Sequence, residues 1–500
     1  MFLNNLIRLF SGKRLRQIKS FKIDLQKAQE KVFWQLVEKG KNTEWGRKYD
    51  YLNIKNIDDF KRNVPISSYE DLEPYIKRMM RGEKNILCPG LVKWFAKSSG
   101  TTSSRSKFIP VTKESLNKIH FQGGRDTLYI YLKNFPKTKV LRGQYIIVAG
   151  SLDRAEDNRR IKVGDISAVM IKNMPFWVKL FIGPGIKTTL LKNWEEKLKK
   201  IVYKAHRKNI TMIVGVPSWI ALLIKKFLEI KNKKSILDIW PNFELLVHGG
   251  VSLEPYKKIL NELLPRDRIN YLEVYNASEG FFAIQDDPRN NDLLLMLDYG
   301  IFYEFLLIEE LKAENPKTLL INEVELDKNY AIIISTNGGL SRYMIGDTIK
   351  FTSLYPHKIR ITGRTKFFIN VFGEEVIVEN AEKAVSLACG QTSARVAEFT
   401  VGPKIFEEHN QGAHEWVIEF EREPENFEEF GRLIDQNLRE INSDYDAKRQ
   451  KDLLLIPPIF HFVSKGTFYN WLSGKGKLGG QNKIPRLSND RKYLAEILKS

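Results

Sequence analysis

The chain has 500 residues, of which 43% are hydrophobic, 11% aromatic and 28% charged. This length allows about two to four domains with sizeable cores, and the composition excludes a wholly disordered, collagen-like or multi-span membrane protein. The formal net charge of +20 would attract nucleic acid, an anionic membrane surface or an anionic small molecule.

The N-terminal segment and the cysteines bear on compartment and partners. Residues 8–22 hold six basic residues and no acid. The basic amphipathic start, residues 2–22, could touch a membrane, but we expect it to pack as a helix onto the large domain. Neither residues 8–22 nor the acid-free stretch 465–483 has a zinc-finger or RNA-recognition pattern, which makes nucleic acid an unlikely partner. No signal-peptide cleavage site follows the start, and Cys88 and Cys389 form no CxxC pair. We therefore expect a cytoplasmic protein with reduced, buried thiols.

Apolar periodicity predicts an α/β fold. In chain order, helical spacing predicts helices at residues 23–39 and 71–81, before strand-like runs at 145–149, 211–216, 244–247, 271–274 and 331–335. Helical stretches lie between several of these runs, at 194–208, 219–228 and 255–264. Alternation of strands and helices is typical of α/β architectures.

A second unit follows the last of these strands. A short strand-like run at 358–361 leads into residues 363–365, where we expect a hinge between a large domain, 1–362, and a small domain, 366–500. Residues 426–438 are predicted as a helix of the small domain, although their Glu-rich start would also suit a solvated turn.

The chemically most informative stretch is a loop of small residues. Ser98, Ser99, Gly100, Thr101, Thr102, Ser103 and Ser104 run together and are followed by Arg105 and Lys107. Such a loop lets backbone amides, hydroxyls and cations surround a phosphate. The Walker pattern cannot be laid on these residues, and a flexible serine-rich surface loop is an equal alternative for the stretch by itself.

Two carboxylates strengthen the phosphate-binding interpretation. Residues 275–280 directly follow the predicted strand 271–274, at the strand end where α/β proteins bind ligands. Glu279 in this stretch could hold a magnesium ion that bridges nucleotide phosphates. Asp347 follows Gly346 and could present its carboxylate to ribose hydroxyls. An Asp after Gly is usually a turn residue, so the nucleotide-binding interpretation rests on the serine-rich loop, the Glu279 stretch and Asp347 occurring together in this order.

These motifs resemble the ANL superfamily of adenylate-forming enzymes, and within it the plant and bacterial acyl-acid amido synthetases named for Gretchen Hagen, the auxin-responsive promoter family. The resemblance covers nearly the whole chain and suggests a bacterial-type member. It extends to further residues of the family pattern: Phe60, Lys61, Val64, Pro65, Tyr69, Tyr75, Ile76, Gly82, Val163, Gly164, Ser167, Gly215, Val216, Pro217, Ser218, Gln481, Lys483, Pro485 and Arg486.

The resemblance implies the firefly luciferase-like adenylating fold, with mixed sheets in a large N-terminal domain and a small mobile α+β C-terminal domain. It also implies a reaction that uses ATP and Mg²⁺. The carboxylate of a small acid attacks the α-phosphate to give an acyl-adenylate, and an amino acid amine then displaces AMP to form an amide.

The resemblance further implies roles for individual residues. It places Ser98, Ser99, Gly100, Thr101 and Thr102 with the nucleotide phosphates, Gly249, Gly250 and Tyr275 near the adenine, and Asp347 at the ribose. Lys107 and Ser278 are further nucleotide-binding candidates. Glu279 would hold the magnesium ion, and Lys483 would be a mobile catalytic cation brought in by rotation about 363–365. Arg125 and Trp219 are candidates for the acyl-acid site, although a surface arginine and a core tryptophan are the simpler interpretations.

The chain departs from the family pattern at two positions. Ser104 stands where the family usually has Gly, and Met344 replaces the superfamily's arginine in the YRxGD motif. Arg342, two positions upstream, is the candidate replacement for that cation.

Two alternatives remain open. An acyl-CoA-forming ligase shares the adenylation chemistry, and a non-catalytic protein could use the +20 charge to bind nucleic acid or membrane. The acid, the amine and the oligomeric state are not predicted by the sequence.

Overall fold

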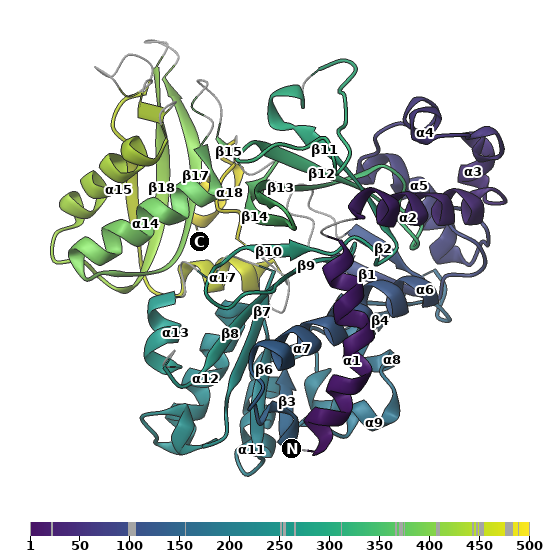
Figure 1. Ribbon diagram of the computed structural model, residues 1–500. Helices are drawn as coiled ribbons and strands as arrows, with labels where there is room; N and C mark the ends of the chain where they lie inside the picture. Colours follow the sequence, from purple (N-terminus) through teal and green to yellow (C-terminus); the bar gives the residue numbers. More distant parts are fainter. Residues whose placement is uncertain are drawn as a thin grey trace.

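The computed structural model describes residues 2–21, 24–98, 107–155, 157–250, 253, 257–264, 267–311, 313–365, 368–369, 374, 376–406, 411–442, 445–446, 449, 455–475, 484–488 and 490–499. The described residues form four β-sheets, which have ten, four, three and two strands. Figure 1 shows the chain in space, with the late C-terminal elements on one side of the large sheet and the first helices on the other.

The ten-stranded sheet has the order β11-β12-β13-β14-β10-β9-β8-β7-β6-β3. The strands β3, β6, β7 and β8 run parallel, and the pairings from β8 to β11 are antiparallel. The strands are β3 (Gln144–Ile147), β6 (Ile210–Gly215), β7 (Leu245–Gly249), β8 (Asn270–Asn276), β9 (Phe281–Gln285), β10 (Leu293–Leu295), β11 (Ile301–Leu307), β12 (Asn329–Thr336), β13 (Tyr343–Leu354) and β14 (His357–Arg364).

The parallel half of the sheet confirms the predicted alternation. Helices α11 (Trp194–Ala205), α12 (Pro217–Lys231) and α13 (Lys257–Leu263) connect its strands. Apolar side chains from these helices and from β6 and β7 share one buried cluster, which includes Ile201 and Ile224. Every residue of β7 is buried, as expected for a parallel strand that is covered on both faces.

A four-stranded sheet carries the serine-rich segment. Its order is β2-β1-β5-β4, from β1 (Trp94–Ser98), β2 (Lys107–Val111), β4 (Leu152–Arg154) and β5 (Lys162–Gly164). Ser98 at the end of β1 pairs with Lys107 at the start of β2, so the two strand ends that flank the serine-rich segment lie side by side.

The N-terminal helices pack on the large domain. They are α1 (Phe2–Ser20), α2 (Leu25–Gly40), α3 (Glu44–Lys48), α4 (Ile57–Asn63) and α5 (Tyr69–Arg81), and they confirm the two helices predicted there. Helix α1 lies against α7 (Gln122–Asn134), where Arg14 forms ion pairs with Asp126 at 2.7 Å and Asp298 at 2.5 Å. The basic start of the chain therefore packs on the large domain, as the sequence predicted.

The C-terminal part has a sheet and a core of its own. Strands β17 (Arg395–Phe406), β18 (Gln411–Arg422) and β19 (Ile459–Val463) form a three-stranded sheet, covered by α14 (Val378–Thr392) and α15 (Phe427–Ile441), while β15 (Phe368–Ile369) and β16 (Val376–Ile377) pair separately (Figure 1). Asn426 caps α15 by accepting a hydrogen bond from the Glu429 amide at 3.0 Å, so the Glu-rich stretch starts a helix and not a solvated turn. Helices α17 (Thr467–Gly474) and α18 (Lys492–Ile497) complete this part.

Three further observations concern earlier expectations. Gly363 and Arg364 end strand β14, so the expected hinge begins inside the large sheet. Burial raises the pKa of the Cys88 thiol to about 12, whereas Cys389 is only half-buried and corrects the prediction of two buried thiols. No helix in the described part of the chain is long and apolar enough to cross a membrane.

Candidate functional site

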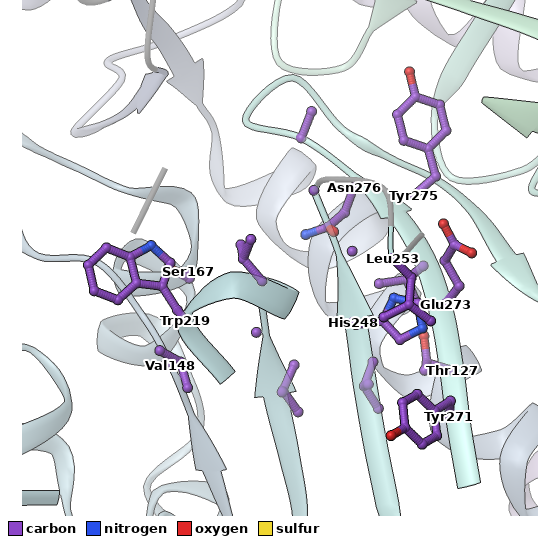
Figure 2. A pocket seen from close by; sticks show the side chains of 18 of the residues that line it. Thr127, Val148, Ser167, Trp219, His248, Leu253, Tyr271, Glu273, Tyr275 and Asn276 are labelled. Atoms are coloured by element: carbon purple, nitrogen blue, oxygen red, sulfur yellow. The ribbon is translucent and has the colours of Figure 1, made fainter. Parts of the chain in front are cut away.

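A cleft of about 1820 Å³ lies at the carboxyl ends of the parallel strands β6, β7 and β8. The ends of β13 and β14 also line it, and so do residues of the C-terminal part, among them Phe468, Ile484 and Arg486. In Figure 2, Val148 and Trp219 lie on one side of the cleft and His248 and Tyr275 on the other, with strand ends between them. The large sheet and the C-terminal part thus share one cavity.

Glu279 lies in the turn between β8 and β9, on the wall of this cleft. Its side chain is buried, and burial raises the pKa of this carboxyl group. The charges of Lys107 and Arg364 act in the opposite direction and lower the Glu279 pKa. A buried carboxylate near two cations is suited to a ligand that carries both metal and phosphate charge.

Ser278, beside Glu279, provides a second sign of a ligand site. Its side chain is buried, yet its hydroxyl has no hydrogen-bond partner among the described residues. Buried polar atoms are nearly always paired in folded proteins, so an orphan hydroxyl on the wall of a cleft indicates a partner that binds from the cleft.

Asp347 is held by two neighbours. The Tyr275 hydroxyl donates a hydrogen bond to its Oδ2 at 2.7 Å, and Arg364 Nε donates to its Oδ1 at 2.6 Å. The sheet sets up the second contact, because Asp347 of β13 and Arg364 of β14 are direct partners in the strand register. Tyr275 is buried, and this burial raises its pKa well above the usual value, so the hydroxyl stays protonated and acts as a donor. These contacts fix the carboxylate at the cleft.

The end of β7 brings backbone close to the cleft. A Cβ atom on Gly249 would lie 2.2 Å from the carbonyl oxygen of Val274, and Gly250 has a φ of +83°. Both positions therefore require glycine. Both residues line the cleft together with Tyr275, Ser278 and Asp347, whereas Lys107 is not among the lining residues.

Arg125 and Trp219 also line the cleft. Arg125 is an exposed residue of α7 that donates a hydrogen bond from Nη2 to Gln122 at 2.6 Å. Trp219 stacks on Trp194 with ring centroids 3.9 Å apart, so it serves packing and forms part of the wall as well. The surrounding wall is apolar and includes Ile147, Met170, Met174, Val214 and Leu222.

Arg342 does not supply the cation that Met344 lacks, which corrects the expected compensation. Its guanidinium is buried and forms an ion pair with Glu304 at 2.8 Å. It also donates to the carbonyl oxygens of Lys61 and Val64, at 2.8 Å and 2.7 Å. These contacts of the Arg342 side chain are structural, and Met344 itself packs against apolar residues of the sheet.

Arg364, and not Arg342, is the arginine that contacts Asp347 at the cleft. Sequence reasoning assigned it to a hinge and missed this contact. A basic residue three positions after the strand-like run 358–361 was the available signal. On the C-terminal side, Arg486 pairs with Glu398 at 2.7 Å, and both residues line the cleft.

Several predicted residues lie outside the described part of the chain. They are Ser99, Gly100, Thr101, Thr102 and Lys483, and the side chain of Ser98 is also outside it. Lys107, directly after the serine-rich segment, places its Nζ 5.4 Å from the centroid of the Tyr69 ring.

Comparison with protein families identifies the type of chain. Models of the GH3 family match three segments: the N-terminal domain over residues 14–269, the central domain over 294–364 and the C-terminal domain over 379–492. The indole-3-acetic acid-amido synthetase GH3.3 of Arabidopsis thaliana is 22% identical over 95% of this chain and 91% of its own length. The jasmonoyl-L-amino acid synthetase JAR4 of Nicotiana attenuata is 22% identical over 93% of this chain and 91% of its own length.

Solved structures share the architecture. The GH3.15 acyl acid amido synthetase matches with a TM-score of 0.80 at 17% identity, over 98% of this chain and 96% of that one. A 2-hydroxyisobutyryl-CoA ligase in the postadenylation state, in complex with R3-HIB-AMP, matches with a TM-score of 0.58 at 12% identity, over 95% and 91% of the two chains. These likenesses confirm the predicted adenylate-forming α/β fold.

Proposed function

This chain belongs to the GH3 family, and from that membership and the geometry of the cleft we propose that it is an ATP-dependent ligase that joins a small carboxylic acid to the amine of an amino acid. The observation that carries the proposal is the convergence of Glu279, Asp347 and Arg364 at the cleft, beside the unpartnered Ser278 hydroxyl. The cytoplasm is the expected compartment.

The reaction has two steps. An oxygen of the acid's carboxylate attacks the α-phosphorus of ATP, pyrophosphate leaves, and an acyl-adenylate forms. The amine nitrogen then attacks the acyl carbon, AMP leaves with the bonding electron pair, the amine loses a proton and an amide remains. The substrates supply both nucleophiles, so the protein's task is to position them and to offset phosphate charge.

The described residues divide this task. Asp347, fixed by Tyr275 and Arg364, would accept hydrogen bonds from the ribose hydroxyls, and the glycine backbone at 249–250 would lie along the adenine. Ser278 and Lys107 would contact the phosphates. Arg125 and Trp219 would contribute to the acid site, where the apolar wall suits a lipophilic acid.

The cleft fits a magnesium ion that is shared with the nucleotide. Mg²⁺ is commonly held by one or two carboxylates plus substrate phosphates, and it does not need a cage of protein ligands. Among the described residues no group of three His, Cys, Asp or Glu side chains is placed to hold a metal. A single carboxylate on the wall of the cleft, that of Glu279, would hold the ion together with the phosphates. The ion would supply neutralisation of phosphate charge.

Carboxylate-dependent exchange between ATP and labelled pyrophosphate tests the first step. We expect exchange with at least one acid from a panel of aromatic, indole and fatty carboxylates. Binding to nucleic acid or vesicles without any exchange would favour the non-catalytic alternative. Exchange alone does not separate the amide ligase from an acyl-CoA ligase, because both adenylate an acid.

Asp347→Asn should raise the KM for ATP about tenfold, because the substitution weakens roughly one hydrogen bond to the ribose and disturbs the contact with Arg364. We expect a smaller change in kcat, since the ribose carries no developing charge. Steady-state exchange rates at varied ATP measure both quantities. Tyr275→Phe should give a weaker effect of the same kind, and an unchanged KM in both variants would contradict the ribose assignment.

Lys483→Ala tests the mobile cation that the family resemblance implies. We expect adenylation to slow by about a hundredfold, the usual cost of an electrostatic donor to a transition state. Amide formation from a chemically supplied acyl-adenylate should proceed at the normal rate, because rotation of the domain 366–500 about 363–365 would have removed the lysine by then. Equal losses in both half-reactions would contradict this alternation.

A further inference from the structure

The segment after helix α8 (Ile166–Asn173) exposes an unusual number of large apolar side chains. Around α9 (Phe176–Lys179), the exposed fractions are 78% for Phe176, 59% for Trp177, 68% for Leu180 and 43% for Phe181. We call these four residues the α9 face. Contiguous exposed apolar side chains on a soluble domain usually mark an interaction surface.

Hydrogen bonds hold the α9 face in its exposed orientation. The Tyr145 hydroxyl donates to the carbonyl oxygen of Val178 at 2.9 Å, and Gln144 Nε2 donates to that of Leu180 at 3.1 Å. Tyr145 also forms a parallel bridge with Ile182, whose side chain is buried against Ala149 and Ile171. Because Ile182 occupies the inner side, the four apolar side chains of the face remain on the outer side.

Basic residues flank the α9 face. Residues 166–194, which contain it, have four lysines and no Asp or Glu, and Lys172 and Lys187 are exposed. Large apolar and aromatic side chains in a segment with exposed lysines and no acidic residue match the interface of a bilayer with anionic lipids.

The α9 face is also continuous with the cleft. Trp177 and Phe181 line the cleft while they are exposed, next to Leu141, Tyr145 and Met174 of the apolar wall. The apolar end of the cavity therefore reaches the surface at this face. Glu279 and Asp347 line the same cavity deeper in the fold, at the strand ends.

We propose that the α9 face docks the protein on an anionic phospholipid membrane, with Phe176, Trp177, Leu180 and Phe181 inserted at the headgroup level and the flanking lysines on the lipid phosphates. Docking places the apolar end of the cleft at the membrane surface. The corollary that a membrane-dissolved carboxylic acid enters there rests on the proposed function, whereas docking itself does not.

Vesicle flotation of the full-length chain tests the proposal. We expect binding to phosphatidylcholine vesicles that contain phosphatidylserine, and little binding to phosphatidylcholine alone or at high salt. The double variant Phe176→Ser and Leu180→Ser should bind the anionic vesicles about tenfold or more weakly, because it loses inserted apolar area. Neither residue lines the cleft, so pyrophosphate exchange should be retained.

The double variant Leu52→Ser and Leu326→Ser is the matched control. Its leucines are 67% and 49% exposed and are not part of the α9 face, and it has the same net charge as the wild type. It should bind vesicles like the wild type. Equal binding by both double variants, or no binding by the wild type, would overturn the proposal. The proposal would also be overturned if the wild type and the control variant were dimers and the Phe176→Ser, Leu180→Ser variant were a monomer, because the α9 face would then bind a second copy of the chain. If the wild type showed no pyrophosphate exchange, this would contradict the proposed reaction but would not affect the conclusion on membrane docking.

Discussion

Glu279→Gln is expected to reduce the rate of adenylation by about a hundredfold or more, because it removes the buried charge that would hold magnesium against the phosphates. Gln has the same size as Glu, so the wall of the cleft keeps its shape. Pyrophosphate exchange at varied Mg²⁺ measures the effect, and the variant should lose the steep magnesium dependence of the wild type.

The pH dependence of the wild type provides an internal check. Burial raises the pKa of Glu279 above its ordinary value of 4.5, and metal binding needs the deprotonated form. The affinity for magnesium should therefore fall with decreasing pH through a pKa above 4.5, and Glu279→Gln should lack this titration.

Stability separates this effect from unfolding. A carboxyl whose pKa is raised in the folded state destabilises the fold above its unfolded pKa, because folding then costs the desolvation of a charge. At neutral pH, Glu279→Gln should thus unfold at the same temperature as the wild type or higher. A variant that is fully folded and exchanges pyrophosphate at the wild-type rate would contradict the role of Glu279.

Arg342→Met is expected to lower the free energy of unfolding by about 3–5 kcal/mol, because it leaves Glu304 as a buried carboxylate without its cation. Urea denaturation followed by circular dichroism measures the change. The two carbonyl oxygens that accept hydrogen bonds from Arg342 would also lose their donor.

The combination with Glu304→Gln tests the cause. Removing the stranded charge from the Arg342→Met variant should recover part of the lost stability, which is the signature of a coupled pair. The folded fraction of Arg342→Met should keep its exchange rate. Normal stability together with lost adenylation would contradict the structural assignment and return Arg342 to the nucleotide site.

The fold was predictable from the sequence where the pattern of apolar residues is compatible with only one arrangement of strands and helices. Apolar runs alternating with helical stretches from residue 145 to 274 gave the parallel half of the large sheet, because strands of this kind are buried on both faces. The carboxylate Glu279 was predictable for the same reason, since ligands bind at the carboxyl ends of such strands.

The cations of the site were not predictable in the same way. Arg342 was the candidate for the missing cation because it lies two positions from Met344, but it pairs with Glu304 and two carbonyl oxygens and does not line the cleft. Arg364 contacts Asp347 across the register of β13 and β14. The partner of a carboxylate in a sheet depends on the strand register, and the register cannot be predicted from a single sequence.

Mass spectrometry of the products tests the central claim most directly. The purified protein would be incubated with ATP, Mg²⁺, the carboxylate panel, a mixture of amino acids and coenzyme A. We predict that an N-acyl amino acid accumulates together with AMP and pyrophosphate. An acyl-CoA thioester without any amide would contradict the proposed acid–amino acid ligase.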